Sequence, residues 1–222
     1  MKVKPLLVTS LIVAGLLALF GVYAASLLPA DARLPVHWNA AGEPDRFEPA
    51  LSALLFAPAL LVGISLLFAV VPRLEPLQDR LEGSAAALRT SWIAMIALLA
   101  LLQFFTAAPA FGIDPPRQWV LMMVGALFLV LGNVLPKTRP GFFVGIRTPW
   151  TIIDTDTWIA THRLGAKCFI AAGAMMLLAG MIGVEGNSQV GVVIAAVTLA
   201  AIVPAAYSWW HWQSKRGGEA SR

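Results

Sequence analysis

The chain has 222 residues, a formal net charge of +4 and a hydrophobic content of 59%. Only 13% of its residues are charged, whereas soluble proteins have roughly 25% charged and about 45–50% apolar residues. A soluble globule of this size has too little core to bury so much apolar surface, so the composition predicts a polytopic membrane protein. The charge is too dispersed to favour nucleic-acid binding, and a single cysteine, Cys168, excludes an intramolecular disulfide.

Six apolar stretches are long enough to cross a hydrocarbon core of about 30 Å, which takes roughly 20 helical residues. We therefore expect an all-α integral membrane protein with six transmembrane helices, over residues 5–28, 51–71, 91–109, 118–135, 164–184 and 189–210. The first stretch exceeds the roughly 7–15 apolar residues of a cleaved signal peptide, so it is expected to be retained. Pro58 and Pro204 fall inside the second and sixth spans and are expected to kink them.

The distribution of cations predicts the orientation of these helices. Of the 16 Lys and Arg residues, 13 fall in the two tails and in the second and fourth connections, while Arg33, Arg46 and Arg117 occupy the other connections. Cytoplasmic connections carry the excess of cations, so both termini are expected in the cytoplasm and a small loop between the first two helices outside. Acidic residues divide evenly between the two sides.

Two of the expected helix ends share the pattern Pro-basic-x-x-Pro, at residues 72–76 and 136–140. Duplication of a helix pair, as in many transporters, explains this pattern, and so does a generic helix stop with a basic anchor. No span carries a charged residue near its centre, which argues against a proton-coupled pump.

The first outer loop, residues 34–49, has an unusual density of turn-forming and polar residues. Residues 35–39 suit an extended segment with Val36 and Trp38 on one face, and residues 39–42 and 43–46 suit turns. The chain is expected to fold back and leave Trp38 and Phe47 free to enter the membrane interface. This fold would gather four polar side chains, those of His37, Asn39, Glu43 and Asp45.

Three interpretations of this outer loop remain open. The first is a lid whose polar side chains hydrogen-bond to its own backbone, and the second is a docking surface for an extracellular ligand. The third is a catalytic or metal site in which one imidazole and nearby carboxylates act together. One histidine is too few for a firm metal prediction, which leaves His37 and Asp45 as weak metal candidates and no cofactor expected. The outer-loop candidates for binding are His37, Trp38, Asn39, Gly42, Glu43 and Asp45.

The inner connection between the fourth and fifth spans is the longest polar segment. Asp154 is a good N-cap, so a helix is expected over residues 155–184, long enough at 1.5 Å per residue to project beyond the bilayer core. Trp158 and His162 are four residues apart and should stack on one face. Arg147, Arg163 and Lys167 suit lipid phosphates or an acidic partner, although ordinary interfacial anchoring explains them as well. The two connections divide the chain into residues 1–71, with the outer motif 34–49, and residues 72–222, with the inner motif 132–167.

Both motifs resemble those of a known family. The outer segment, Pro35-Val-His-Trp-Asn-Ala-Ala-Gly-Glu-Pro-Asp-Arg-Phe47, resembles the short domain of unknown function in the first loop of SdpI-family bacterial membrane proteins. The inner stretch is similar to the second hallmark of that family; it contains Gly132-Asn133, Pro136-Lys137, Gly145-Ile-Arg-Thr-Pro-Trp150 and Trp158-x-x-Thr-His-Arg-Leu-Gly165. The inner candidates for binding are Asn133, Arg147, Pro149, Trp150, Trp158, His162 and Arg163.

The resemblance implies a multi-pass immunity protein of the bacterial cytoplasmic membrane that gives resistance to a secreted toxic peptide. It also implies a second role, capture of a cytoplasmic repressor once the toxin is sensed. The expected partners are then membrane lipids, a toxic peptide on the outer face and a repressor protein on the inner face. The residues themselves leave two alternatives open: an enzyme acting on lipid or peptide at the outer interface through His37 with Asp45 or Glu43, and a small exporter.

Overall fold

The computed structural model describes residues 3–39 and 41–220, without the side chains of residues 78–81 and 218–220. Six helices in this part of the chain are long and apolar enough to cross a membrane, as the sequence predicts. The long helices are α1 (Lys4–Ser26), α2 (Ala50–Leu74), α3 (Gln78–Ala107), α4 (Gln118–Val134), α6 (Thr155–Met181), α7 (Gly186–Val197) and α8 (Val203–Ala220). The shorter elements are β1 (Arg33–Trp38), β2 (Pro44–Pro49), η1 (Ala108–Phe111), η2 (Leu135–Lys137), α5 (Pro149–Ile153) and the π-helical η3 (Thr198–Ile202).

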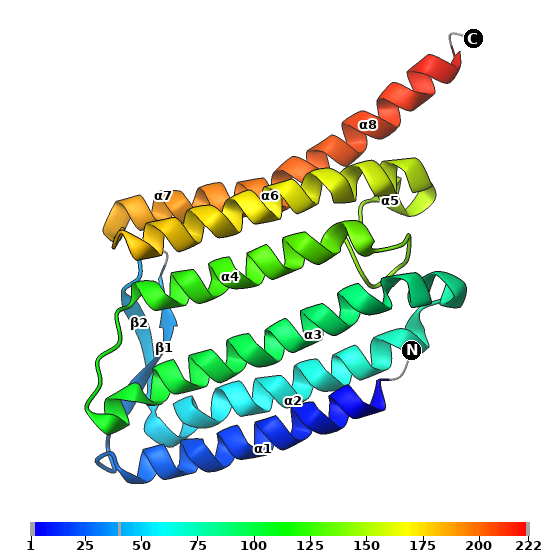
Figure 1. Cartoon of the computed structure of the whole chain (residues 1–222). Helices are drawn as coiled ribbons and strands as arrows, with labels where there is room; N and C mark the ends of the chain where they lie inside the picture. The colour runs from blue at the N-terminus through cyan, green and yellow to red at the C-terminus, as the bar shows by residue number, and fades with distance from the viewer. Residues whose placement is uncertain (1–2, 40, 221–222) are drawn as a thin grey trace.

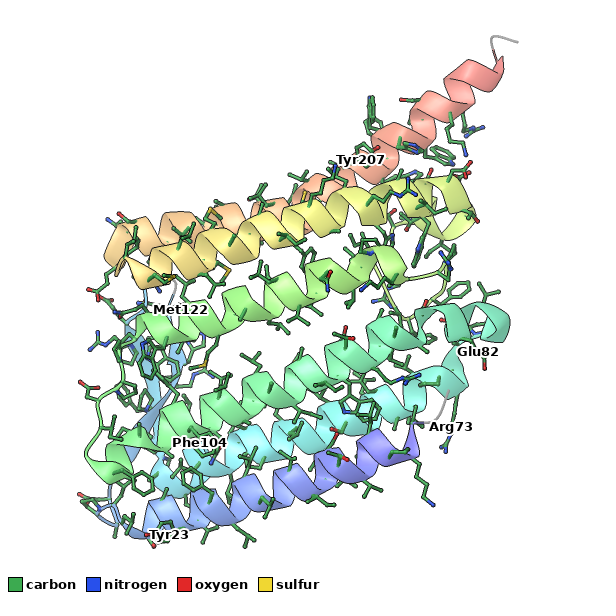
Figure 2. All side chains as sticks on the ribbon, in the orientation of Figure 1. Tyr23, Arg73, Glu82, Phe104, Met122 and Tyr207 are labelled. Carbon is green, nitrogen blue, oxygen red and sulfur yellow. The ribbon has the colours of Figure 1, made fainter. Side chains whose placement is uncertain are left out.

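The helices form two groups that lie side by side (Figure 1). Helices α1, α2 and α3 pack against one another, and α6 packs against α4, α7 and α8, while α3 contacts α4 between the groups. The β1–β2 hairpin lies at one end of the bundle, which we call the hairpin end. The other end, which we call the tail end, carries the start of α1, the end of α8 and the short helix α5. Figure 2 shows Arg73 and Glu82 at the tail end and Tyr23, Phe104 and Met122 towards the hairpin end.

Close approach of α4 to α6 depends on glycine. A Cβ atom on Gly125 would lie 2.9 Å from the carbonyl oxygen of Gly173, and one on Gly173 would lie 2.6 Å from the carbonyl oxygen of Gly125. Lipid tails are as apolar as leucine, so membrane helices associate through close van der Waals packing at small residues rather than through hydrophobic burial. The glycine pair therefore fixes how α4 and α6 meet.

Two helix boundaries lie further from the apolar core than hydropathy indicates. Helix α3 begins at Gln78, 13 residues before the start of the predicted span at residue 91. Helix α6 begins at Thr155, as predicted, because the Asp154 carboxylate accepts a hydrogen bond of 2.6 Å from the backbone N–H of Thr157. Its 27 residues give a length of about 40 Å, which exceeds the hydrocarbon core by roughly 10 Å.

The two prolines inside the spans have different effects. Helix α2 continues through Pro58 as one element. The last span instead changes to the π-helical turn η3 just before Val203 and Pro204. Proline has no N–H to donate to the preceding turn, and a π-turn is a common way for a helix to accommodate a disrupted hydrogen-bond ladder.

We predict that both tails lie in the cytoplasm, because of the cation distribution. The native cysteine, Cys168, is buried, so it can be replaced by alanine to give a background for single exposed cysteines. Cysteine at Glu48, an exposed hairpin position, should react with an impermeant maleimide in intact cells. Cysteine at Gln213, an exposed position of α8, should react only after the cells are permeabilised. The reverse pattern would refute this orientation.

Candidate functional site

The outer loop folds as an antiparallel β-hairpin. Leu34 pairs with Glu48 and Trp38 pairs with Pro44, with a register irregularity on both sides of His37. This irregularity keeps the extended strands but changes which side chains share a face. The predicted extended segment is confirmed for residues 35–38.

The hairpin brings the four predicted polar side chains into two pairs. The Asn39 side-chain oxygen accepts the backbone N–H groups of Ala41 and Glu43 at 2.9 and 3.0 Å, and its amide donates to the Glu43 carboxylate at 3.2 Å. The His37 Nδ1 and the Asp45 Oδ1 lie 2.5 Å apart, with both side chains about half exposed. The hydrogen bond from His37 lowers the pKa of Asp45, so the carboxylate stays ionised somewhat below the usual range of aspartate.

Apolar contacts fasten the hairpin to the α1–α3 group. Leu34 is buried in a cluster with Ala24 and Leu54. The Trp38 ring meets Phe105 of α3 edge-on, with 5.5 Å between ring centroids. Phe47 is 43% exposed, and its place at the membrane interface stays a prediction, whereas Trp38 is half-buried and packs on Phe105.

The hairpin tip reaches the second helix group. Gly42 has a φ of +84°, and a Cβ atom there would lie 2.8 Å from the side-chain amide of Gln189 in α7. With its amide oriented to match its neighbours, Gln189 donates to the Val184 carbonyl at 3.1 Å and accepts the Gly42 N–H at 3.3 Å. Glycine at position 42 therefore permits both the turn and the contact with α7.

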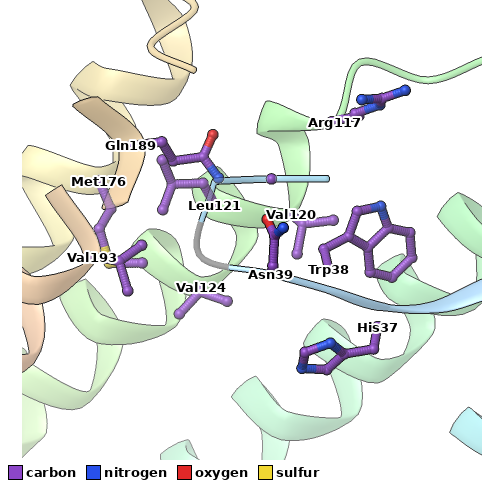
Figure 3. Close-up of a pocket in the computed structure, with 11 residues that line it drawn as sticks. His37, Trp38, Asn39, Arg117, Val120, Leu121, Val124, Met176, Gln189 and Val193 are labelled. Atoms are coloured by element: carbon purple, nitrogen blue, oxygen red, sulfur yellow. The ribbon is translucent and has the colours of Figure 1, made fainter. Parts of the chain in front are cut away.

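A cavity of about 370 Å³ lies beneath the hairpin tip (Figure 3). Its rim carries Trp38, Asn39 and Gln189, and its apolar wall is formed by helices α4, α6 and α7. The wall residues are Val120, Leu121, Val124, Met176 and Val193. Long-range packing creates this cavity, and the sequence pattern gave no signal for it.

The inner motif folds as a second unit at the tail end. The His162 and Trp158 rings stack at 4.0 Å, as their spacing predicts. The His162 Nδ1–H donates to the Trp158 carbonyl and its Nε2 accepts the Ile146 N–H, both at 2.8 Å. His162 is 1% exposed and Trp158 is fully buried. Accepting at Nε2 while donating at Nδ1 requires a neutral imidazole, so this histidine acts as a fixed bridge between α6 and the preceding segment.

Gly145 makes this bridge possible. Its φ is +122°, a conformation that favours glycine, and a Cβ atom there would overlap Nε2 of His162 and lie 2.8 Å from the Trp158 ring. A Cβ atom on Gly165 would lie 2.5 Å from the side chain of Ile146. Packing around the His162 bridge thus explains four characteristic positions of the motif: Gly145, Trp158, His162 and Gly165.

Sequence reasoning missed Glu75, a buried carboxylate between α2 and α3. Glu75 is 3% exposed, and its carboxylate accepts the backbone N–H groups of Phe142 and Phe143 at 2.9 and 3.2 Å. The Ser84 hydroxyl similarly accepts the Arg139 N–H at 2.8 Å. The first Pro-basic-x-x-Pro segment, residues 72–76, therefore binds the residues that directly follow the second, and α3 binds the second segment itself. The only sequence signal for Glu75 was its place inside the first segment.

Helix α8 is tied to the start of α6. Lys215 donates to the Asp154 carboxylate at 2.9 Å and to Asp156 at 2.8 Å, and the Thr157 hydroxyl lies 3.2 Å from Nδ1 of His211. Burial raises the pKa of Asp154, but the hydrogen bonds from Lys215 and Thr157 outweigh it and bring the pKa to about 2. This carboxylate therefore stays ionised at any physiological pH.

The remaining inner candidates lie near the surface. Trp150 is half-buried, and the Arg147 guanidinium donates to the Phe142 carbonyl at 2.7 Å. The exposed candidates are Asn133, Arg147, Pro149 and Arg163. Among the described residues, no three His, Cys, Asp or Glu side chains gather closely enough to hold a metal ion.

Both sequence motifs thus form folded units at opposite ends of six apolar spans, and the class of protein is a multi-pass membrane protein with a structured unit at each interface. Comparisons with known proteins agree. The SdpI/YfhL protein family matches residues 137–208, and the Domain of unknown function (DUF1648) matches residues 12–62. These matches confirm the resemblance of the two motifs to the SdpI family of bacterial membrane proteins.

One curated relative is the Immunity protein SdpI of Bacillus subtilis (strain 168). It is 24% identical to this chain over 124 residues, which are 55% of this chain and 59% of the relative. The match therefore spans less than two thirds of that relative's length. No solved structure matches the chain.

Replacing Gly145 by alanine should destabilise the tail end, because it forces an unfavourable φ and a clash with the His162–Trp158 pair. Strain of this kind is worth roughly 1–3 kcal/mol. We expect a lower melting temperature in thermal unfolding of the purified protein. Gly191→Ala is the matched control, since a Cβ atom there meets nothing within 4 Å. Equal stability of the two variants would contradict this account of the motif.

Proposed function

We propose that the protein is a membrane immunity protein that protects the cell against a secreted toxic peptide by engaging it at the hairpin. The family match and the name of the Bacillus subtilis relative support an immunity role. The observation that carries the proposal is the exposed His37–Asp45 pair on a hairpin fastened to both helix groups. A recognition surface of this kind is held in place before the ligand arrives, so binding loses little conformational entropy.

The charge of the hairpin end indicates the kind of peptide that it would attract. Three arginines lie there with six exposed carboxylates, so the surface is net acidic with neutral histidine. A net acidic surface steers cationic ligands towards it and weakens as salt is added. We therefore infer a cationic or amphipathic peptide. The six carboxylates are Asp31, Glu43, Asp45, Glu48, Asp114 and Glu185.

Signalling through a cytoplasmic repressor is the finer part of this proposal. The exposed cations Arg147 and Arg163 flank the rigid His162 bridge, and they suit an acidic protein surface. Replacing both by glutamine should weaken repressor capture while leaving folding intact, because neither side chain is buried. Trp158 and His162 would act indirectly in such capture, by holding this surface in position.

Protection can be tested in sensitive cells that express the chain and are challenged with the secreted toxic peptide. Alanine at His37 and at Asp45 should each lower survival at least tenfold, the effect of losing one charge-assisted hydrogen bond. Membrane levels should not change, because the pair is exposed. Glu48→Gln is the matched control, an exposed carboxylate of the same hairpin without a hydrogen bond among the described residues.

The pH dependence of protection provides a second measurement. The pKa of Asp45 is lowered in the folded protein, so the contribution of its ionised form is present above the usual value of 3.8 and is lost as the pH falls below it. Protection through this carboxylate should therefore persist through mildly acidic medium. Parent-like survival of both alanine variants at every pH would show that the hairpin is only a lid.

A further inference from the structure

Beneath the hairpin tip, two hollows of different chemistry adjoin each other. The larger, of about 370 Å³, has apolar walls that include Val124 and Val193. The smaller, of about 90 Å³, is lined by Glu43, Glu185 and other polar groups. Both are bounded by Gly42, Arg117 and Gln189, so they share one boundary. The larger volume lies within the roughly 300–1,000 Å³ typical of ligand sites.

The depths of the hollows match the layers of a lipid monolayer. Val124 lies six residues beyond the start of α4, and Val193 lies seven residues beyond the start of α7. At 1.5 Å per residue these positions are about 9–10 Å inside the helix ends. The apolar wall therefore extends into the hydrocarbon, while Arg117 and Glu185 stand at the helix ends, at the level of the headgroups.

The charges at the boundary complement a zwitterionic headgroup. Arg117 is exposed and precedes α4 directly, and its guanidinium makes no hydrogen bond or ion pair among the described residues. Its guanidinium suits the two oxygens of a phosphate. Glu43 and Glu185 lie on the side of the small hollow and are acceptors for an ammonium group. One cation and two carboxylates around the same small hollow are the charges that a phosphate and an amine would need.

We propose that the two hollows form one binding site for an aminophospholipid. One acyl chain occupies the apolar cavity, the phosphate binds Arg117, and the primary ammonium group lies between Glu43 and Glu185. The small hollow favours an ammonium that donates hydrogen bonds over a bulkier trimethylated one. The site adjoins the exposed His37–Asp45 pair, because His37 also lines the apolar cavity, whereas Asp45 lines neither hollow. The lipid proposal does not depend on the proposed immunity function.

Native mass spectrometry of the full chain can test the site. The purified protein is mixed with equal amounts of phosphatidylethanolamine, phosphatidylglycerol and phosphatidylcholine that carry identical acyl chains. We expect one retained phosphatidylethanolamine per protein, in preference to the other two lipids. Retention of phosphatidylglycerol or phosphatidylcholine instead would overturn the proposal. So would the absence of any retained lipid, the result expected if the cavity takes a peptide side chain.

Two pairs of variants locate the lipid. Val193→Trp should fill the apolar cavity and abolish retention, whereas Ile194→Trp, at a neighbouring position that is 60% exposed, should retain the lipid. Glu185→Gln should lower the preference for phosphatidylethanolamine over phosphatidylglycerol about fivefold, the effect of one charge near a headgroup. Glu48→Gln should leave it unchanged. Equal retention of lipid by the two tryptophan variants would refute the site, and so would an unchanged lipid preference in Glu185→Gln. Because Glu185 is exposed, its replacement should not disturb folding.

Discussion

The contact between α3 and α4 is the junction on which the bundle depends. Among the described helices, it and the adjoining turn η2 provide the helix contacts between the α1–α3 group and the α4–α8 group. Helices in lipid gain little from hydrophobic burial, so one helix pair gives a weak junction. Non-helical segments strengthen this junction at both ends of the bundle. There, backbone groups outside a helix can find hydrogen-bond partners without facing lipid. The hairpin joins Leu34 on one side to Gln189 on the other, and Glu75 does the same at the tail end.

The sequence predicted the features that depend on local chemistry. Apolar length gave six spans because any helix in lipid must satisfy its own backbone and present apolar side chains. Asp154 marked the start of α6 because an N-cap carboxylate needs only the N–H groups of the next turn. Asn39 marked the hairpin turn for the same reason, since both N–H groups that its side chain accepts lie within four residues.

The features that the sequence did not predict depend on contacts between distant residues. Glu75 lies 67 residues from Phe142, and no pattern along the chain shows that a carboxylate before Pro76 will accept N–H groups of another connection. The contact of Gly42 with Gln189, two residues that line the cavity, joins the first loop to the last span. Hydropathy also placed the start of α3 too late, because it detects the part of a helix in lipid and not the polar turns beyond it.

The hairpin turn lies between the two proposed ligands, and this position has a thermodynamic consequence. His37 and Asp45 are exposed on the strands, while His37, Asn39 and Gly42 line the cavity beneath. A lipid in the cavity would reduce the freedom of the turn, so a peptide that binds the strands afterwards would lose less conformational entropy. Linkage makes the effect reciprocal: if the lipid tightens peptide binding by some factor, the peptide tightens lipid binding by the same factor. The hydrogen bond from the Gly42 N–H to the Gln189 side chain physically links the two sites. Without it, the hairpin tip could move away from α7 and the cavity would lose its rim.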